Sequence, residues 1–145
     1  MKKITLLFLF AGLAQFHLLS QSCLPEGITF TRQGQIDSFQ VNYPGCNVIE
    51  GFVLVTGNDI SNLSGLNAID SILGRFIIDY AFFLQDLSGL ETLEYIGDDF
   101  VIQDAHSLHY MTGLETLSTI GGDLEITWNE GLFSLDGLQL LTTVG

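Results

Sequence analysis

Apolar residues recur along this chain at a fixed step of 24 residues. Four Leu/Met-x-Gly-Leu segments place their glycines at positions 65, 89, 113 and 137. Three further apolar columns, which begin at Ile60, Ile69 and Ile72, keep the same step without insertion or deletion. A constant period of this length is typical of repeat proteins, in which each unit buries its apolar side against the next. The pattern therefore predicts a solenoid.

One segment of each repeat alternates between two sets of positions, as a β-strand does. Equivalent strands in stacked repeats would pair in parallel, about 4.8 Å apart. We therefore predict an all-β solenoid, a right-handed leucine-rich parallel β-helix with four complete strands in one sheet and a phenylalanine ladder inside. The predicted inward set is Phe52, Leu54, Phe76, Ile78, Phe100, Ile102, Leu124 and Ile126, and the predicted outward set includes Val53, Ile77, Val101 and Glu125.

The residues before the repeats divide into a targeting segment and a cap. Lys2 and Lys3 followed by an apolar stretch and small residues predict a signal peptide over 1–20, and no later segment is long enough to span a bilayer. Residues 21–47 are predicted to cap the first repeat, with a short helix over 35–42 that directs Ile36 and Phe39 inward. The repeats would occupy 48–145, and we expect them to be truncated, because the chain stops where another strand would begin.

Two cysteines and the charge balance indicate the environment of the chain. In an exported protein an isolated pair is most simply one disulfide, here Cys23–Cys46. The chain has 17 acidic residues, and only Arg32 and Arg75 carry positive charge beyond the signal peptide. Nucleic acids, anionic membranes and acidic polysaccharides are therefore disfavoured as partners. We expect a secreted or outer cell-surface protein that does not insert into the membrane.

The segment Cys46-Asn47-Val48-Ile49-Glu50-Gly51-Phe52-Val53-Leu54-Val55 resembles the opening of the receptor L-domain. That domain is the ligand-binding leucine-rich β-helix in the ectodomains of the insulin and epidermal growth factor receptors. The repeat also looks like that of fungal cell-wall proteins of the same superfamily. Secreted proteins predicted in marine Bacteroidota are similar too, with Cys-Leu-Pro-Glu-Gly-Ile-Thr-Phe opening the mature chain. The resemblance covers residues 23–145 and implies a β-helix with a cysteine-bracketed helix on its first turn.

Residues for catalysis are in short supply. Only His106 and His109 remain beyond the signal peptide, and the period places His106 beside Glu130, where a surface ion pair would form. Arg75 has Asp99 as its neighbour in the next repeat, which predicts a salt bridge. The enzymatic alternative is a β-helix polysaccharide lyase or hydrolase, but a lyase needs cations to stabilise developing negative charge. We therefore predict that the protein is not an enzyme.

Metal binding has limited support. Stacking would place Asp70 over Glu94 and Glu91 over Glu115, and such columns of like charge attract cations. The sequence allows weak Ca²⁺ binding, but it contains neither an EF-hand loop nor a glycine-rich calcium repeat. No metal site and no cofactor are predicted.

The candidate binding surface combines the outward side of the strands with the turns after them. The period aligns Tyr80 and Trp128 on either side of Asp104, with Phe82 and Phe83 nearby. Exposed aromatics offer a large contact area at little entropic cost, which suits a protein or glycan ligand. The predicted function is a binding or recognition module, and a structural or adhesive scaffold of the cell envelope is the alternative. The candidate residues are Tyr80, Asp104, Trp128, Val53, Ile77 and Val101.

Overall fold

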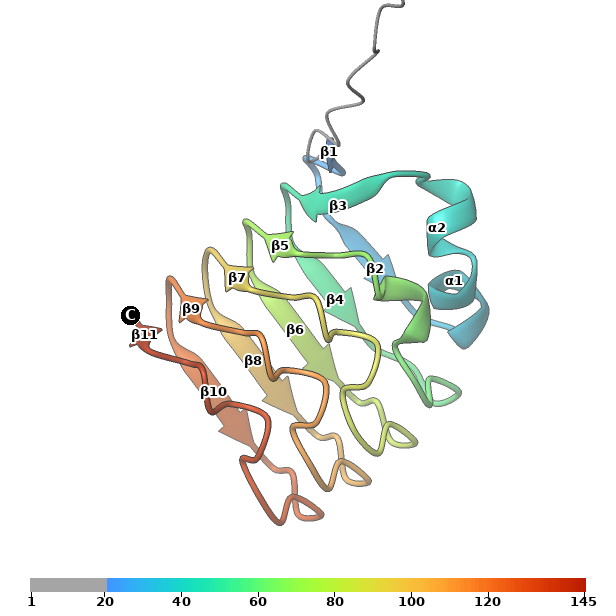
Figure 1. The fold of residues 1–145 in the computed structure, drawn as a ribbon. Helices are drawn as coiled ribbons and strands as arrows, with labels where there is room; N and C mark the ends of the chain where they lie inside the picture. The colour runs from blue at the N-terminus through green and yellow to red at the C-terminus, as the bar shows by residue number, and fades with distance from the viewer. Residues whose placement is uncertain (1–20) are drawn as a thin grey trace, which may run out of the picture.

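The computed structural model describes residues 21–145, so the predicted signal peptide lies outside the described residues. Figure 1 shows a parallel β-solenoid, which confirms the predicted all-β architecture. Each turn contributes a strand to each of two sheets, so the expectation of one sheet was wrong. One sheet has six strands, β1 (Gln21–Cys23), β3 (Cys46–Ile49), β5 (Ser71–Ile72), β7 (Tyr95–Ile96), β9 (Thr119–Ile120) and β11 (Thr143–Val144). The other has five, β2 (Ile28–Phe30), β4 (Val53–Val55), β6 (Phe76–Asp79), β8 (Phe100–Gln103) and β10 (Leu124–Thr127).

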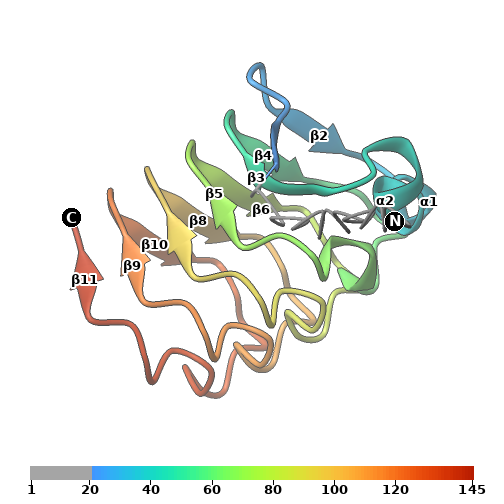
Figure 2. The ribbon, with the colours of Figure 1, turned by 45° about the horizontal axis from the view of Figure 1, so that its top comes forward.

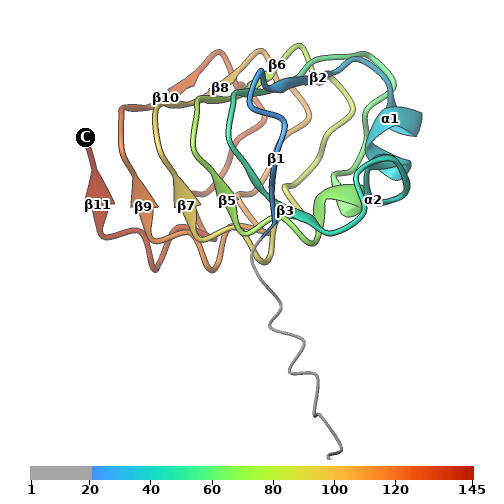
Figure 3. The same cartoon turned by 90° about the horizontal axis from the view of Figure 1, so that it is seen from above.

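The two sheets lie on opposite sides of the solenoid, as Figure 3 shows. From β6 onward the pairing keeps the predicted period, because Phe76 lies opposite Phe100 and Phe100 lies opposite Leu124. The rings of Phe76 and Phe100 are fully buried and stacked, with centroids 5.0 Å apart and planes 5° from parallel. Burying one such side chain contributes roughly 2–3 kcal/mol to folding. This part of the phenylalanine ladder is confirmed.

The turn that contains β3 and β4 is one residue shorter than the later turns, and this corrects the register predicted for β4. Val53, not Phe52, lies opposite Phe76, and Val53 is fully buried while 42% of Phe52 is exposed. Leu54 correspondingly lies opposite Ile77 on the outer face. The missing residue falls in the turn after β4.

The position of the deletion follows from the hydrogen bonds of the turns. The Ile60 N–H donates to the carbonyl of Gly57, as the Leu84 N–H donates to that of Ala81 in the next turn. Gly57 therefore takes the place of Ala81. Tyr80, the residue before Ala81, therefore has no counterpart in the turn that contains β4.

The segment expected only to cap the solenoid also begins both sheets. β1 and β2 pair in parallel with β3 and β4, although their steps of 25 to 26 residues hide them from the repeat pattern. The disulfide between Cys23 and Cys46 is present and links these two turns, with Cα atoms 5.8 Å apart. Figure 2 shows the later turns stacked in order away from this end.

Two short helices replace the single helix predicted over 35–42. They are α1 (Gln33–Asp37) and α2 (Phe39–Asn42), and they pack beside the 3₁₀ turn η1 (Ser64–Leu66) of the next turn. Ile36 and Phe39 are fully buried, as their spacing predicted. The ring of Phe39 meets that of Phe30 edge-on at 5.8 Å, so the helices close the core at this end.

A glycine in each later turn allows neighbouring backbones to approach closely. Gly89, Gly113 and Gly137 have φ between +109° and +117°, a region that side chains disfavour. A Cβ on Gly113 would also collide with the carbonyl of Leu87 in the preceding turn. The carboxylates of Glu91 and Glu115 accept hydrogen bonds from the N–H groups of Gly89 and Gly113 at 2.9 Å. These stacked glutamates therefore hold the turns.

Candidate functional site

The turns after β6, β8 and β10 place Tyr80, Asp104 and Trp128 in one column across three successive turns. All three residues adopt left-handed backbone conformations, with φ of 53°, 51° and 54°. Aspartate tolerates this conformation well, whereas large aromatic residues rarely adopt it. The side chains of Tyr80 and Trp128 are 51% and 70% exposed. Packing into the core therefore does not explain why aromatic residues occupy these strained positions.

Hydrogen bonds from the neighbouring turn fix the backbone around Trp128. The amide of Asn129 accepts from the Ala105 N–H at 2.9 Å and donates to the carbonyl of Ile102 at 2.8 Å. The Nδ1 atom of His106 lies 3.2 Å from the Trp128 carbonyl. The exposed indole thus stands on a turn that is tied to the preceding turn at three points.

Ring contacts also connect the turns. Phe82 meets Tyr80 edge-on at 5.9 Å, and it lies against the His106 ring at 5.4 Å. The ion pair expected between His106 and Glu130 is not formed, because Arg75–Asp99 is the one salt bridge found in residues 21–145. His106 instead contacts Phe82 and the carbonyl of Trp128.

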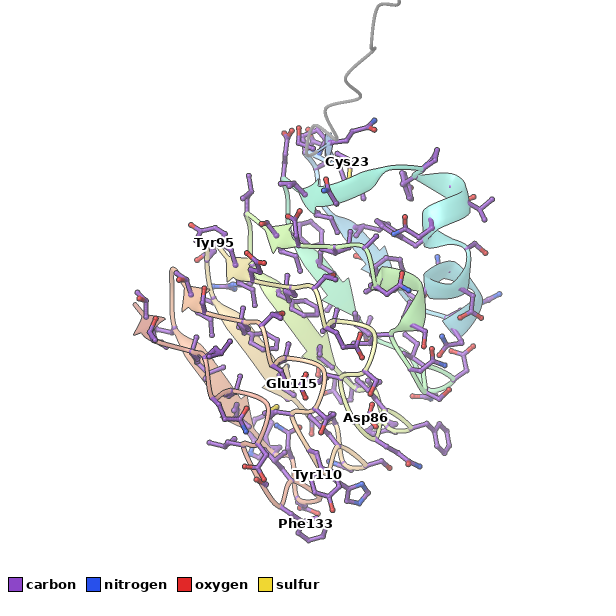
Figure 4. The ribbon with its side chains drawn as sticks, in the orientation of Figure 1. Cys23, Asp86, Tyr95, Tyr110, Glu115 and Phe133 are labelled. Atoms are coloured by element: carbon purple, nitrogen blue, oxygen red, sulfur yellow. A yellow bond between two sulfur atoms is a disulfide. The ribbon has the colours of Figure 1, made fainter. Side chains whose placement is uncertain are left out.

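A second aromatic group occupies the same turns. The ring of His109 stacks on Phe133 at 5.4 Å and lies 6.3 Å from Tyr110. Half or more of each side chain of Phe83, Tyr110 and Phe133 is exposed. Figure 4 shows Tyr110 and Phe133 together at the lower end of the molecule, far from Tyr95 and Cys23. We call the side chains of these turns the aromatic edge, which comprises Tyr80, Phe82, Phe83, Tyr110, Trp128 and Phe133.

The outer face of the five-stranded sheet is less distinctive than predicted. Ile77 and Val101 are half-buried neighbours on this face, between Leu54 and the exposed Glu125. Val53 is fully buried in the core, so its place in the candidate surface was wrong, for the register reason given above. Of the six candidate residues, the structure brings Tyr80, Asp104 and Trp128 into one column and leaves Ile77 and Val101 on the adjoining sheet.

Charge on the outer face is locally compensated at one point. Arg75 and Asp99 form the salt bridge that their spacing predicted. The pKa of the Asp99 carboxyl is held below its ordinary value, first by the hydrogen bond from the backbone N–H of Asp123 and then by Arg75. This pair therefore links the segments that precede β6 and β8, at the opposite end of these strands from the aromatic edge.

Across residues 21–145, no three histidine, cysteine or acidic side chains come together as a metal site would require. Within the same span, no helix is long and apolar enough to cross a membrane.

Sequence reasoning missed Tyr110 and Phe133 as members of the aromatic edge, and it missed the role of Asn129. A signal was available for Phe133, because the 24-residue step aligns it with His109 and Gln85. Nothing in the step reveals that Phe133 is exposed. Comparison of the sequence with protein-family models and with curated proteins finds no match.

Proposed function

We propose that this protein is a recognition module, secreted or held at the outer cell surface, that binds its ligand through the aromatic edge. The observation that carries the proposal is the left-handed conformation of the exposed Tyr80 and Trp128. A strained backbone at a bulky exposed residue lowers stability by about 1 kcal/mol or more, and strain of this kind is concentrated at functional sites. A scaffold without a site would be better served by Asn or Gly at both positions.

The disulfide supports the location in this proposal. Cys23–Cys46 joins two adjacent turns, and bonds of this kind persist in oxidising compartments. The two cysteines flank α1 and α2 in the sequence, and the second of them, Cys46, begins β3. This is the arrangement that the resemblance to receptor L-domains implies. We infer kinship with those domains on this basis.

The test measures binding of the purified chain to arrays of glycans and of extracellular proteins. The double variant Tyr80→Ala/Trp128→Ala should lose the interactions that the original chain makes. Tyr95→Ala is the matched control, because Tyr95 is also exposed but lies on β7, away from the edge. Circular dichroism would verify that both variants fold. If the double variant keeps every interaction, the aromatic edge is not the binding surface, and a scaffold role is favoured.

A further inference from the structure

We propose that the ligand of the aromatic edge is a neutral β-1,4-linked polysaccharide, of glucose or N-acetylglucosamine, that lies along the solenoid axis across Tyr80, Asp104 and Trp128. This inference rests on the proposed function and names the ligand class for the same site. It is based on the spacing, chemistry, rigidity and charge of the column.

The spacing of the column matches such a chain. Tyr80 and Trp128 stand two turns apart, and strands of adjacent turns are about 4.8 Å apart, so the backbones that carry the two rings are separated by about 10 Å along the axis. In an extended β-1,4-linked chain successive sugars are flipped, so every second ring presents the same face. The repeat of two sugars is close to two strand spacings. One sugar can therefore stack on Tyr80 and the next but one on Trp128.

The chemistry of the column alternates in the same way. The apolar C–H face of an equatorially substituted pyranose packs against an aromatic ring, while its edge presents hydroxyl groups. Asp104 lies in the turn between the two aromatic residues, where its carboxylate can accept hydrogen bonds from the intervening sugar. Each of the three residues thus faces a part of the chain that suits it.

The column is rigid before a ligand arrives. The Asn129 amide ties the turn of Trp128 to that of Asp104, and Phe82 packs on Tyr80. A site that is already ordered loses little conformational entropy on binding. The turn that contains β4 adds nothing to the column, because Gly57 replaces Ala81 and the residue equivalent to Tyr80 is missing. The footprint therefore starts at Tyr80 and includes Asp104 and Trp128 of the next two turns.

Charge selects a neutral ligand. The chain has 17 acidic residues, and Arg75, one of the two arginines in the described chain, is paired with Asp99. Anionic polysaccharides would be repelled. A second copy of this chain would bring two acidic surfaces together. A basic peptide is not favoured either, because the acidic residues are spread over the whole solenoid and do not gather at the column. Residues 80–85, 104–109 and 128–133 contain only two acidic residues, Asp104 and Glu130.

Titration with cello- and chito-oligosaccharides of increasing length tests the inference. Trp128 is the only tryptophan of the chain, so its fluorescence reports binding at the column. Affinity should rise steeply from the disaccharide to the trisaccharide, because three sugars are needed to reach both aromatic platforms. Calorimetry should show at least about a fivefold loss of affinity for Tyr80→Ala and for Trp128→Asn, because each variant removes one of the two aromatic platforms. Tyr80→Phe and Trp128→Phe, which keep a ring, should retain most of the affinity, and Tyr95→Ala should retain all of it.

The controls separate this inference from the proposed function. Alginate, dextran and oligolysine should not change the fluorescence of Trp128. The inference is overturned if neither oligosaccharide series binds, if affinity does not rise between two and three sugars, or if oligolysine or alginate binds instead. If another ligand is found whose binding requires Trp128, the proposed function stands without this inference. If no interaction of the chain depends on the aromatic edge, both are wrong.

Discussion

Two neighbouring columns of the repeat differ in how far their chemistry varies. The inward column contains Ile60, Leu84, Leu108 and Leu132, all branched aliphatic residues. The outward column four residues earlier contains Tyr80, Asp104 and Trp128, and its chemistry changes at every turn. Inward positions must fill a close-packed core, so volume and shape restrict them. Outward positions on the aromatic edge escape that restriction, and recognition can be built there without altering the stack.

The largest expected effect lies in the core. Phe100→Ala should lower the free energy of unfolding by about 3–5 kcal/mol, because it removes a buried ring that stacks on Phe76. Leu124→Ala affects the same column one turn later, where the side chain is only partly buried, and should cost at most about 2 kcal/mol. Urea unfolding measures both. Equal losses would show that inward positions are not ranked by their burial.

The glycine turns should be the next most sensitive. Gly113→Ala should cost at least about 2 kcal/mol, because φ is +109° and the added Cβ meets the backbone of Leu87. Gly34→Ala is the matched control, since Gly34 lies in α1 with open space where its Cβ would be. It should be neutral or slightly stabilising. Thermal unfolding of the two variants separates backbone crowding from the general effect of adding a methyl group.

On the aromatic edge we expect a change in the opposite direction. Trp128→Asn should raise the free energy of unfolding by about 1 kcal/mol, because asparagine relieves the strain of the left-handed backbone. Tyr110→Asn, at an exposed aromatic with ordinary φ, should bring no gain. Chemical denaturation measures both variants. A loss of stability in Trp128→Asn would mean that the indole packs favourably, and the argument from strain would fail.

The smallest effect concerns pH. The pKa of Asp99 is lowered in the folded chain, so its carboxylate stabilises the fold above its unfolded pKa of about 4, and this contribution is lost as the pH falls through the folded pKa. Asp99→Asn should therefore be less stable than the original chain at neutral pH, and the difference should close in acid. Asp98→Asn, an exposed neighbour, should show no such closing gap. Unfolding midpoints measured across pH 2 to 7 test this. The stability difference between Asp99→Asn and the original chain should begin to shrink as the pH falls below about 4.

The sequence predicts the solenoid well because its strongest signal, the 24-residue step, is imposed by stacking. The register predicted for β4 is wrong for a physical reason. Phe52 looks equivalent to Phe76 by type and by step, but the shorter turn at Gly57 shifts the register and buries Val53 instead. The 23-residue step from Ile49 to Ile72 was the available signal. A shift of one residue exchanges the two faces of a strand, so one missing residue reverses every assignment on β4.

The candidate site was only partly predictable. Alignment of Tyr80, Asp104 and Trp128 follows from the period. Their left-handed backbone does not, because Tyr and Trp rarely adopt that conformation and so give no local signal for it. The contacts of Asn129 with Ala105 and Ile102 depend on how the turns stack. They could be found only in three dimensions.

Because of the disulfide, the two ends of the solenoid should respond differently to a pulling force. Hydrogen bonds between turns run along the axis, so tension along the axis loads them one turn at a time, as in a zipper. Pulling at residue 21 would transmit force through the Cys23–Cys46 bond directly into β3. The intervening β2, α1 and α2 would carry none of that load. The covalent bond thus shields the N-terminal turn from unravelling, and the turns beyond it yield first.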